Sequence, residues 1–230
     1  MKFYKFVNPE GHNGMVYKEG LNTDILPFNP KGDCEPGGVY FSREDILAFL
    51  GYGPDLYEVE PVGEVYENPG YPKKWKAHEV KLKYVGERTD LKVLKMLLDE
   101  GADIHAGADG LIYWAATKGH TDIVAFALDQ GADIHVENDA PLRRAARFGS
   151  LETVKLLLER GANIHADGDG ALWRAACDGH LEIVKFLLDE GAYPNCQAAF
   201  TLALHNGHTE VVKLLTENRY KAADIKEIDK

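Results

Sequence analysis

Cysteine is scarce in this chain of 230 residues. The three cysteines, Cys34, Cys177 and Cys196, are odd in number, and their spacing fits neither a disulfide framework nor a metal site. No Asn-x-Ser/Thr sequon occurs, and the N-terminus lacks the apolar stretch of a secretory signal. We therefore expect an intracellular protein in a reducing compartment, the cytoplasm.

Long hydrophobic runs and an excess of positive charge are also lacking. No stretch approaches the roughly 18 consecutive apolar residues of a membrane-spanning helix, so no membrane partner is expected. The formal net charge is −11: residues 1–86 hold 10 basic and 13 acidic groups, which leaves −3, and residues 87–230 hold 16 and 24, which leaves −8. Because nucleic-acid binding requires clustered Lys and Arg, nucleic acid is not expected as a partner.

Proline is rare in the second part of the chain. Eight of the ten prolines lie at or before Pro72, and eight of the eleven tyrosines lie at or before Tyr84. The remainder is rich in Ala, Leu and charged residues, which is a helical composition. This shift predicts an α+β N-terminal domain of unknown function at 1–86, helical repeats at 87–220 and a frayed polar tail at 221–230.

A segment recurs every 30 residues in this helical part. Its copies begin at Gly101-Ala-Asp-Ile-His105, Gly131-Ala-Asp-Ile-His135, Gly161-Ala-Asn-Ile-His165 and Gly191-Ala-Tyr193. Between them lie the glycines Gly119, Gly149, Gly179 and Gly207, three of which are followed by His. An amphipathic run follows each glycine, with apolar residues at helical spacing.

Each repeat is predicted to be a pair of short helices. An alanine pair such as Ala145-Ala146 lets neighbouring first helices approach closely. The following Gly149 ends that helix, because Gly accepts the left-handed cap conformation. Glu152 then complements the positive N-terminus of the second helix. One such pair cannot bury its own apolar face, whereas several stacked pairs can.

The pattern Leu-x-x-Ala-Ala-x-x-Gly-His-x-x-Ile-Val-x-x-Leu-Leu-x-x-Gly-Ala-Asp, which covers roughly residues 89–218, resembles the ankyrin repeat. The resemblance implies an α-helical ankyrin-repeat solenoid of four to five short repeats. Because residues 76–86 have the alternation of a strand, the first repeat lacks its first helix, and we infer that the small α+β N-terminal domain caps the stack. The family usually repeats at about 33 residues, so the 30-residue period predicts truncated hairpins. The resemblance also implies a monomeric, non-catalytic protein-protein interaction module without a cofactor.

The N-terminal domain is expected to contain several strands and one helix. The helix should follow Ser42-Arg-Glu-Asp45, which has the pattern of a capping box. The expected strands are Phe3–Val7, Met15–Tyr17, Gly38–Phe41, Leu56–Val59 and Ala77–Tyr84.

Three N-terminal motifs, together with the short repeat period, are similar to the ankyrin family of giant DNA viruses of amoebae. The motifs are His12-Asn-Gly14 with Tyr17 to Leu21, Cys34 to Phe41, and Trp75-Lys-Ala77. This resemblance implies a viral protein in the host cell cytoplasm whose partner is a host or viral protein.

The binding face is expected on the first helices, which line the concave surface of an ankyrin stack. Trp, Tyr and Arg, which are enriched in interface hot spots, gather there, and four arginines form a basic centre in an acidic domain. We therefore expect the face to bind an acidic or mixed segment of another protein. In the alternative interpretation, the tryptophans are core residues and the arginines pair with local carboxylates. The expected contact residues are Tyr113, Trp114, Lys118, Arg143, Arg144, Arg147, Phe148, Trp173, Arg174, Asp178 and His205.

Catalytic and metal sites are not expected in the repeats. Six of the nine histidines occupy equivalent repeat positions. These positions are roughly 8–10 Å apart in stacked helices, too far for one metal ion, so we interpret these histidines as bonding the loops. The segments Gly107-Ala-Asp-Gly110 and Asp167-Gly-Asp-Gly170 look like calcium loops but lack the Glu at loop position twelve, so we interpret them as shortened turns between repeats.

One enzymatic alternative concerns the N-terminal domain. The segment Gly38-Val-Tyr-Phe-Ser42 is similar to part of the ADP-ribosyltransferase fold, in which a Tyr, here Tyr40, stacks on nicotinamide. The first strand offers Tyr4-Lys5-Phe6 in place of the family's His or Arg, and Glu79 is only a loose match to its late Glu. The alternative function is therefore a degenerate ADP-ribosyltransferase-like domain targeted by the repeats.

Overall fold

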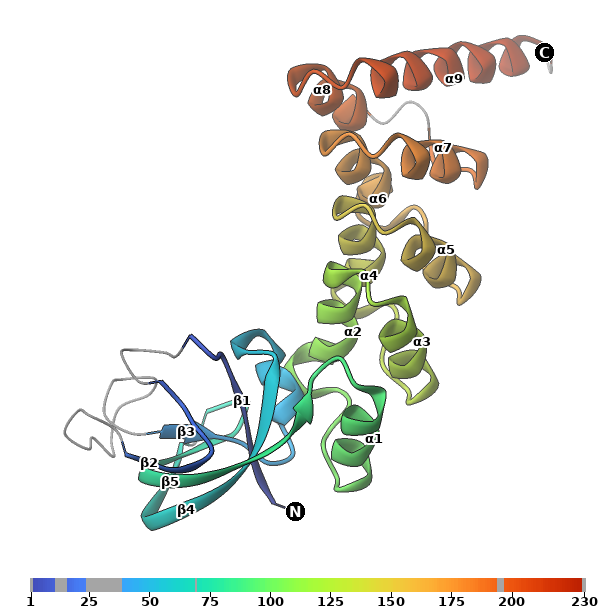
Figure 1. Ribbon diagram of the computed structural model, residues 1–230. Coiled ribbons are helices and arrows are strands. Elements are labelled where there is room, and N and C mark those ends of the chain that lie inside the picture. The colour runs from blue at the N-terminus through green and yellow to red at the C-terminus, as the bar shows by residue number, and fades with distance from the viewer. Residues whose placement is uncertain (1, 11–15, 24–38, 69, 194–196, 229–230) are drawn as a thin grey trace. The chain divides into compact units, whose positions relative to one another are not determined.

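A computed structural model describes residues 2–10, 16–23, 39–68, 70–193 and 197–228 (Figure 1). The chain divides into two compact units. The first holds residues 1–111 with 130–132, and the second holds residues 112–129 and 133–230. This division lies downstream of the domain boundary that composition predicts near Gly86, and that boundary stays a prediction.

An antiparallel five-stranded sheet forms much of the first unit (Figure 1). Its strands are β1 (Phe3–Val7), β2 (Gly20–Thr23), β3 (Val39–Phe41), β4 (Asp55–Asn68) and β5 (Lys74–Glu87). They lie in the order β1-β4-β5-β2, and β3 also pairs with β5. β4 and β5 form a long hairpin whose register shifts between Val62 and Val65.

Most of the expected strands are found, with changed ends. β1 has the predicted bounds, whereas Leu56–Val59 and Ala77–Tyr84 are parts of the longer β4 and β5. The described residues of the expected strand at Met15–Tyr17 are not in a strand, and Met15 and Gly38 lie outside the described residues. β2 was not predicted, because Gly and Asn have low strand propensity.

The sheet buries an apolar core on one face. Val39, Phe41, Val59, Ala77, Val80 and Leu82 form this core. The Phe3 ring packs against its edge, 4.8 Å from the Phe41 ring and 5.3 Å from the Trp75 ring between centroids. Aromatic and β-branched side chains from separate strands thus hold the sheet together.

The helix expected after Ser42 forms as a 3₁₀ helix, η1 (Ile46–Tyr52), and is not capped as predicted. The Ser42 hydroxyl donates to the Lys73 carbonyl at 2.7 Å, and the Asp45 carboxylate accepts the Lys73 amide at 2.5 Å. Both side chains therefore hold the residue that precedes β5, and neither caps the N-terminus of η1.

Helix α1 (Leu91–Asp99) belongs to the same unit as the sheet. Asp90 caps it, accepting the Lys92 amide at 2.8 Å. The Tyr4 hydroxyl on β1 donates to the Glu100 carboxylate at 2.9 Å, which bonds the sheet to the end of α1.

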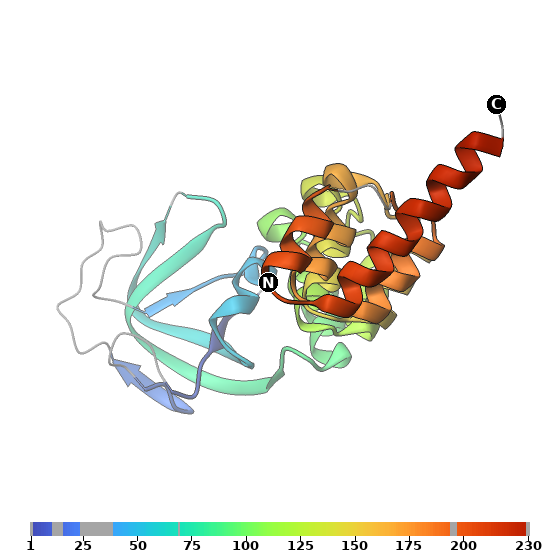
Figure 2. The ribbon, with the colours of Figure 1, turned by 90° about the horizontal axis from the view of Figure 1, so that it is seen from above.

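Pairs of helices build the second unit, which α2 (Ala106–Lys118) enters from the first. The later helices are α3 (Thr121–Asp129), α4 (Val136–Arg147), α5 (Leu151–Glu159), α6 (Ala166–Cys177), α7 (Leu181–Asp189), α8 (Gln197–His205) and α9 (Thr209–Ile228). The first helices α4, α6 and α8 pack in one row, and the second helices α3, α5, α7 and α9 pack in another (Figures 1 and 2). The alanine pair Ala145-Ala146 is fully buried in this packing, as the sequence predicts.

A left-handed turn opens each of α2, α4 and α6. Residues 107–109, 137–139 and 167–169 all have φ between 49° and 68°. Three consecutive residues in this conformation are unusual, since each non-Gly residue there is sterically strained. No β-strand separates the repeats within the described residues. This turn replaces the longer hairpin and is consistent with the 30-residue period.

The final helix, α9, continues to Ile228. It therefore overlaps the segment 221–230 for which the sequence predicts a frayed tail, and residues 229 and 230 lie outside the described part. Among the described residues, no helix combines the length and apolar character needed to cross a membrane.

Candidate partner-binding face

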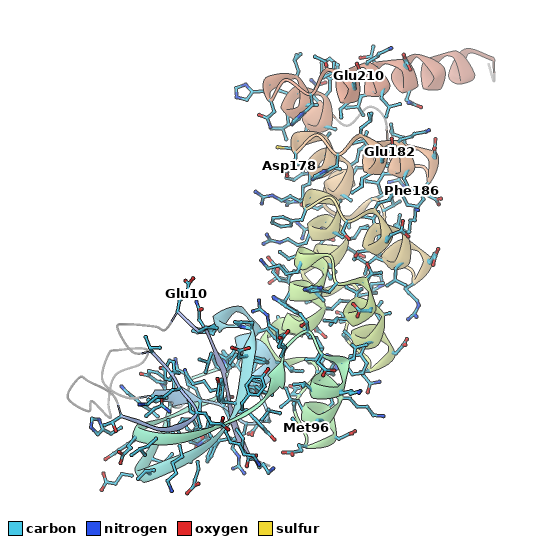
Figure 3. The ribbon with its side chains drawn as sticks, in the orientation of Figure 1. Glu10, Met96, Asp178, Glu182, Phe186 and Glu210 are labelled. Carbon is cyan, nitrogen blue, oxygen red and sulfur yellow. The ribbon has the colours of Figure 1, made fainter. Side chains whose placement is uncertain are left out.

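The row of first helices brings equivalent repeat positions side by side. Arg144 and Arg147 lie one turn apart on α4, and Arg174 on α6 is 30 residues beyond Arg144. In Figure 3, Asp178 lies at the end of α6, whereas Phe186 lies on α7 in the other row. The expected contact residues from 143 to 178 therefore lie on or at the end of the helices in this row, whereas Tyr113, Trp114 and Lys118 lie on α2.

Each of these three arginines stacks on an aromatic ring. The Arg144 guanidinium carbon lies 4.7 Å from the centroid of the Tyr113 ring. Arg174 lies 4.2 Å from the Trp173 ring, and Arg147 lies 5.6 Å from the Phe148 ring. Such cation–π contacts restrict the guanidinium while leaving its N–H groups available to a partner.

Arg144 differs from its neighbours because it has no anionic partner. Arg147 pairs with Asp178 at 3.5 Å and Arg174 with Asp167 at 3.4 Å. Within the described part of the chain, the Arg144 guanidinium makes neither an ion pair nor a hydrogen bond. Burial, and then the positive charges of Arg147 and Arg174, lower the pKa of the Arg144 guanidinium. An anion at this position would relieve that repulsion.

Arg143, also an expected contact residue, is occupied by the repeat itself. Its guanidinium donates to the carbonyls of Glu137 and Asn138, at 2.5 and 3.1 Å, and to the Asp167 carboxylate at 3.0 Å. Its side chain is only 15 % exposed. Arg143 therefore fastens the left-handed turn of its own repeat to the next repeat.

The other expected residues divide by exposure. Trp114 is buried, at 8 % exposure, and packs against the His120 ring, so it offers little surface to a partner. Lys118, Phe148, Asp178 and His205 are exposed. Leu204, which was not expected, is 59 % exposed on α8. The sequence could have indicated this residue, because Ala203-Leu204 stands where the earlier repeats have an alanine pair such as Ala175-Ala176.

The repeat histidines hold the loops together. The Nδ1 atoms of His105, His135 and His165 lie 2.9–3.1 Å from the carboxylates of Asp109, Asp139 and Asp169. In the other position, the Nε2 atoms of His180 and His208 donate to the carbonyls of Arg147 and Cys177 at 2.8 and 3.0 Å.

The aspartates of these pairs are the functional feature that sequence reasoning missed. Each lies four residues after its histidine and is 4–6 % exposed. The sequence could have indicated them, because Asp109, Asp139 and Asp169 recur at the 30-residue period of the repeats. Two of these aspartates lie in the segments that look like calcium loops, where they bond to histidine.

Tyr40 and Glu79, the residues of the transferase-like alternative, have contacts within the sheet. The ammonium groups of Lys74 and Lys76 lie 5.1 and 4.9 Å from the centroid of the Tyr40 ring. The Glu79 carboxylate accepts the Thr23 hydroxyl at 2.8 Å. These contacts do not test the alternative, which stays a prediction.

Comparison with known proteins identifies the repeats. The family model described as "Ankyrin repeats (3 copies)" matches residues 82–168 and 163–229. The chain belongs to the ankyrin repeat family. Ankyrin repeats are generally protein-interaction modules, which agrees with the predicted function at this level.

Three relatives come from Acanthamoeba polyphaga mimivirus. An ankyrin repeat protein of this virus is 36% identical over 126 residues, which cover 49% of this chain and 40% of the relative. A second ankyrin repeat protein of the virus is 35% identical over 131 residues, which cover 51% of this chain and 37% of the relative. An uncharacterized protein of the virus is 32% identical over 133 residues, which cover 53% of this chain and 94% of the relative. The match thus spans about two fifths of the two named ankyrin relatives, and the predicted resemblance to giant-virus ankyrin proteins is confirmed.

Proposed function

We propose that the chain binds an acidic segment of a partner protein on the first-helix face of the second unit. The unpaired guanidinium of Arg144, stacked on Tyr113 between two further arginines, is the observation that supports this function. A partner carboxylate would supply the missing anion and would form a charge-assisted, bidentate contact with the guanidinium.

The surroundings of Arg144 favour a protein partner. Exposed Phe148 and Leu204 and the partly exposed Trp173 supply the apolar and aromatic area that interface hot spots use. Arg147 is half-exposed and its ion pair with Asp178 is long, at 3.5 Å. Such a pair contributes little by itself, so Arg147 can turn toward a partner carboxylate at low cost.

The proposal includes the wider organisation of the molecule. The repeats form a helical solenoid of four to five units over residues 87–220, capped by the N-terminal domain at 1–86. The chain acts as a monomer without enzymatic activity in the cytoplasm of a host cell, and its partner is a host or viral protein. The mimivirus relatives support this setting.

Affinity capture from an Acanthamoeba lysate tests the proposal. The full chain, the Arg144→Ala/Arg174→Ala variant and the Arg160→Ala variant serve as baits. Arg160 pairs with Asp129 outside the face, so its variant also removes positive charge but leaves the face intact. We expect a protein that the wild type and Arg160→Ala retain and that the double variant loses at least tenfold. Equal retention by all three baits would reject this face as the binding site.

A further inference from the structure

The arginine cluster carries more positive charge than its own carboxylates neutralise. Its guanidiniums are Arg143, Arg144, Arg147 and Arg174, and the paired carboxylates are Asp167 and Asp178. Four positive and two negative charges leave a net charge of +2 on this patch. Residues 87–230 as a whole carry −8, so the patch is a local exception.

Two of these guanidiniums have donors without acceptors. The Arg144 guanidinium has no hydrogen-bond or ionic partner among the described residues. Arg174 keeps one ion pair, at 3.4 Å to Asp167, but its buried Nε–H has no acceptor. A buried donor that stays unsatisfied is costly, so this geometry favours a ligand that brings several acceptor oxygens.

We propose that Arg144, Arg147 and Arg174 form a site for a phosphoryl group, and that the acidic segment of the partner is a phosphorylated peptide. This inference rests on the proposed function and specifies its ligand. A phosphorylated side chain carries nearly two negative charges and three strong acceptor oxygens. It matches the +2 excess, whereas one carboxylate supplies one charge and two oxygens. Arginine clusters are a recurring solution for binding phosphorylated peptides.

The rings beneath the guanidiniums support this assignment. Tyr113 and Trp173 hold Arg144 and Arg174 at 4.7 and 4.2 Å, so each planar fork is oriented before binding. Bidentate phosphate recognition depends on such a fixed fork, which Lys cannot supply.

A single phosphoryl group fits better than a nucleic-acid backbone. Asp167 and Asp178 flank the cluster, with side chains 43 % and 39 % exposed. They would repel the phosphates on either side of a bound one. A nucleic-acid site instead needs a continuous basic track, which the acidic repeats lack.

Fluorescence-polarisation binding tests the proposal with degenerate peptide libraries around a fixed central residue. The central residue is phosphoserine or phosphotyrosine, with Glu or unmodified Ser as controls. We expect the full chain to bind a phosphorylated library at least tenfold more tightly than the Glu library. Arg144→Ala and Arg144→Lys should each reduce this affinity about tenfold, and Arg160→Ala should leave it unchanged. Circular dichroism establishes that each variant is folded.

Three results would overturn the proposal. Equal affinity for the phosphorylated and Glu libraries would show that the site takes carboxylates. Equal loss of affinity with Arg160→Ala would show a general charge effect. Binding of a single-stranded oligouridylate as tight as that of the phosphorylated library, with the same loss in Arg144→Ala, would identify a nucleic-acid site.

Phosphatase treatment of the lysate separates this inference from the proposed function. If a partner is captured through Arg144 before and after treatment, the face binds proteins and the phosphoryl assignment is wrong. If treatment abolishes the capture, and phosphorylated peptides bind, both are supported. If the phosphorylated libraries bind but no lysate protein depends on Arg144, the phosphoryl site stands and the partner-capture proposal fails.

Discussion

The Oδ1 atom of Asp139 accepts the backbone amide of Asn163 at 2.8 Å, across the boundary between two repeats. Asp169 repeats this bond with the amide of Tyr193 at 3.1 Å. In its own repeat, Asp139 is held by His135 Nδ1 at 3.1 Å. Each buried aspartate therefore connects the left-handed turn of one repeat to the loop of the next, besides the apolar packing of the helices.

Replacing Asp139 should weaken this connection. Asp139→Ala removes the acceptor of both the His135 ring and the Asn163 amide. We expect the free energy of unfolding of the second unit to fall by about 2–3 kcal/mol, since bonds to charged groups contribute about 1.5–3 kcal/mol. Urea denaturation followed by circular dichroism measures it. Glu159→Ala, which removes an exposed carboxylate without a hydrogen bond, is the control, and an equal loss there would contradict the assignment.

Gly149, which ends the first helix α4, should tolerate a methyl group less well than Gly161, which ends the second helix α5. Gly149 and Gly161 both have positive φ, +80° and +98°. A Cβ on Gly149 would lie 2.7 Å from the His180 ring, whereas one on Gly161 meets nothing within 4 Å. Both Ala variants carry similar backbone strain, so Gly149→Ala should be less stable by a further 1–2 kcal/mol, about the cost of overpacking. Thermal melts that rank them equally would refute the packing argument.

The neighbouring residues Arg143 and Arg144 should separate stability from binding. Arg143→Ala removes three hydrogen bonds, two of them to carbonyls of the left-handed turn, and should lower the free energy of unfolding by about 2 kcal/mol. Arg144→Ala removes only a ring contact, so its stability should change by less than about 1 kcal/mol. Urea titrations give both values. A greater loss from Arg144→Ala would reverse the roles assigned to the pair.

Lys5 should make stability depend on pH above neutrality. Its ammonium donates to the Tyr40 carbonyl at 3.0 Å, and burial lowers the pKa of Lys5 from 10.5 to about 8. Between pH 8 and 10 the unfolded chain keeps a proton that the folded chain has lost, so stability should rise with pH in this window. The contribution is at most about 1 kcal/mol per pH unit.

Comparison of urea midpoints at pH 7 and pH 9 measures the Lys5 effect. Lys5→Met should abolish the rise and should be more stable than the wild type at pH 7, where most folded molecules carry the charged ammonium. Lys83→Met, at an exposed position on β5, should keep it. If Lys5→Met retains the full pH dependence, the titration belongs to another group.

The repeats could be predicted from sequence because their burial follows the helical period. The buried alanine pairs and the caps at Gly149 and Gly179 recur at a fixed phase. The turns at residues 107–110 and 167–170 were also predicted, but not their left-handed conformation, because Ala108 and Glu137 are residues that rarely adopt positive φ. Arg143 and Arg144 therefore looked equivalent in the sequence. Only the geometry of the turn separates them, because it places two carbonyls within reach of the Arg143 guanidinium and none within reach of Arg144.

The N-terminal sheet was predicted less completely. β1 and the hairpin of β4 and β5 carry apolar alternation, whereas β2 has none and is held by pairing with β5. The capping pattern at Ser42 and Asp45 was assigned to the helix that follows it, but both side chains bond Lys73, which is 28–31 residues away. Sequence-local rules cannot detect a partner at that distance.

Asp139 and Asp169 each bond a backbone amide of the following repeat, so the stack has a direction and its inner repeats are joined by equivalent bonds. Excision of residues 161–190 would present the amide of Tyr193 to Asp139, in the same phase as the amide of Asn163, so this bond between repeats would be kept when a whole repeat is lost. At the corresponding position of the α8 repeat, the residue is Ala199, which is fully buried and has no side-chain acceptor. A repeat grafted behind α9 would find no docking carboxylate there, so lengthening of this protein is confined to duplications upstream of that alanine.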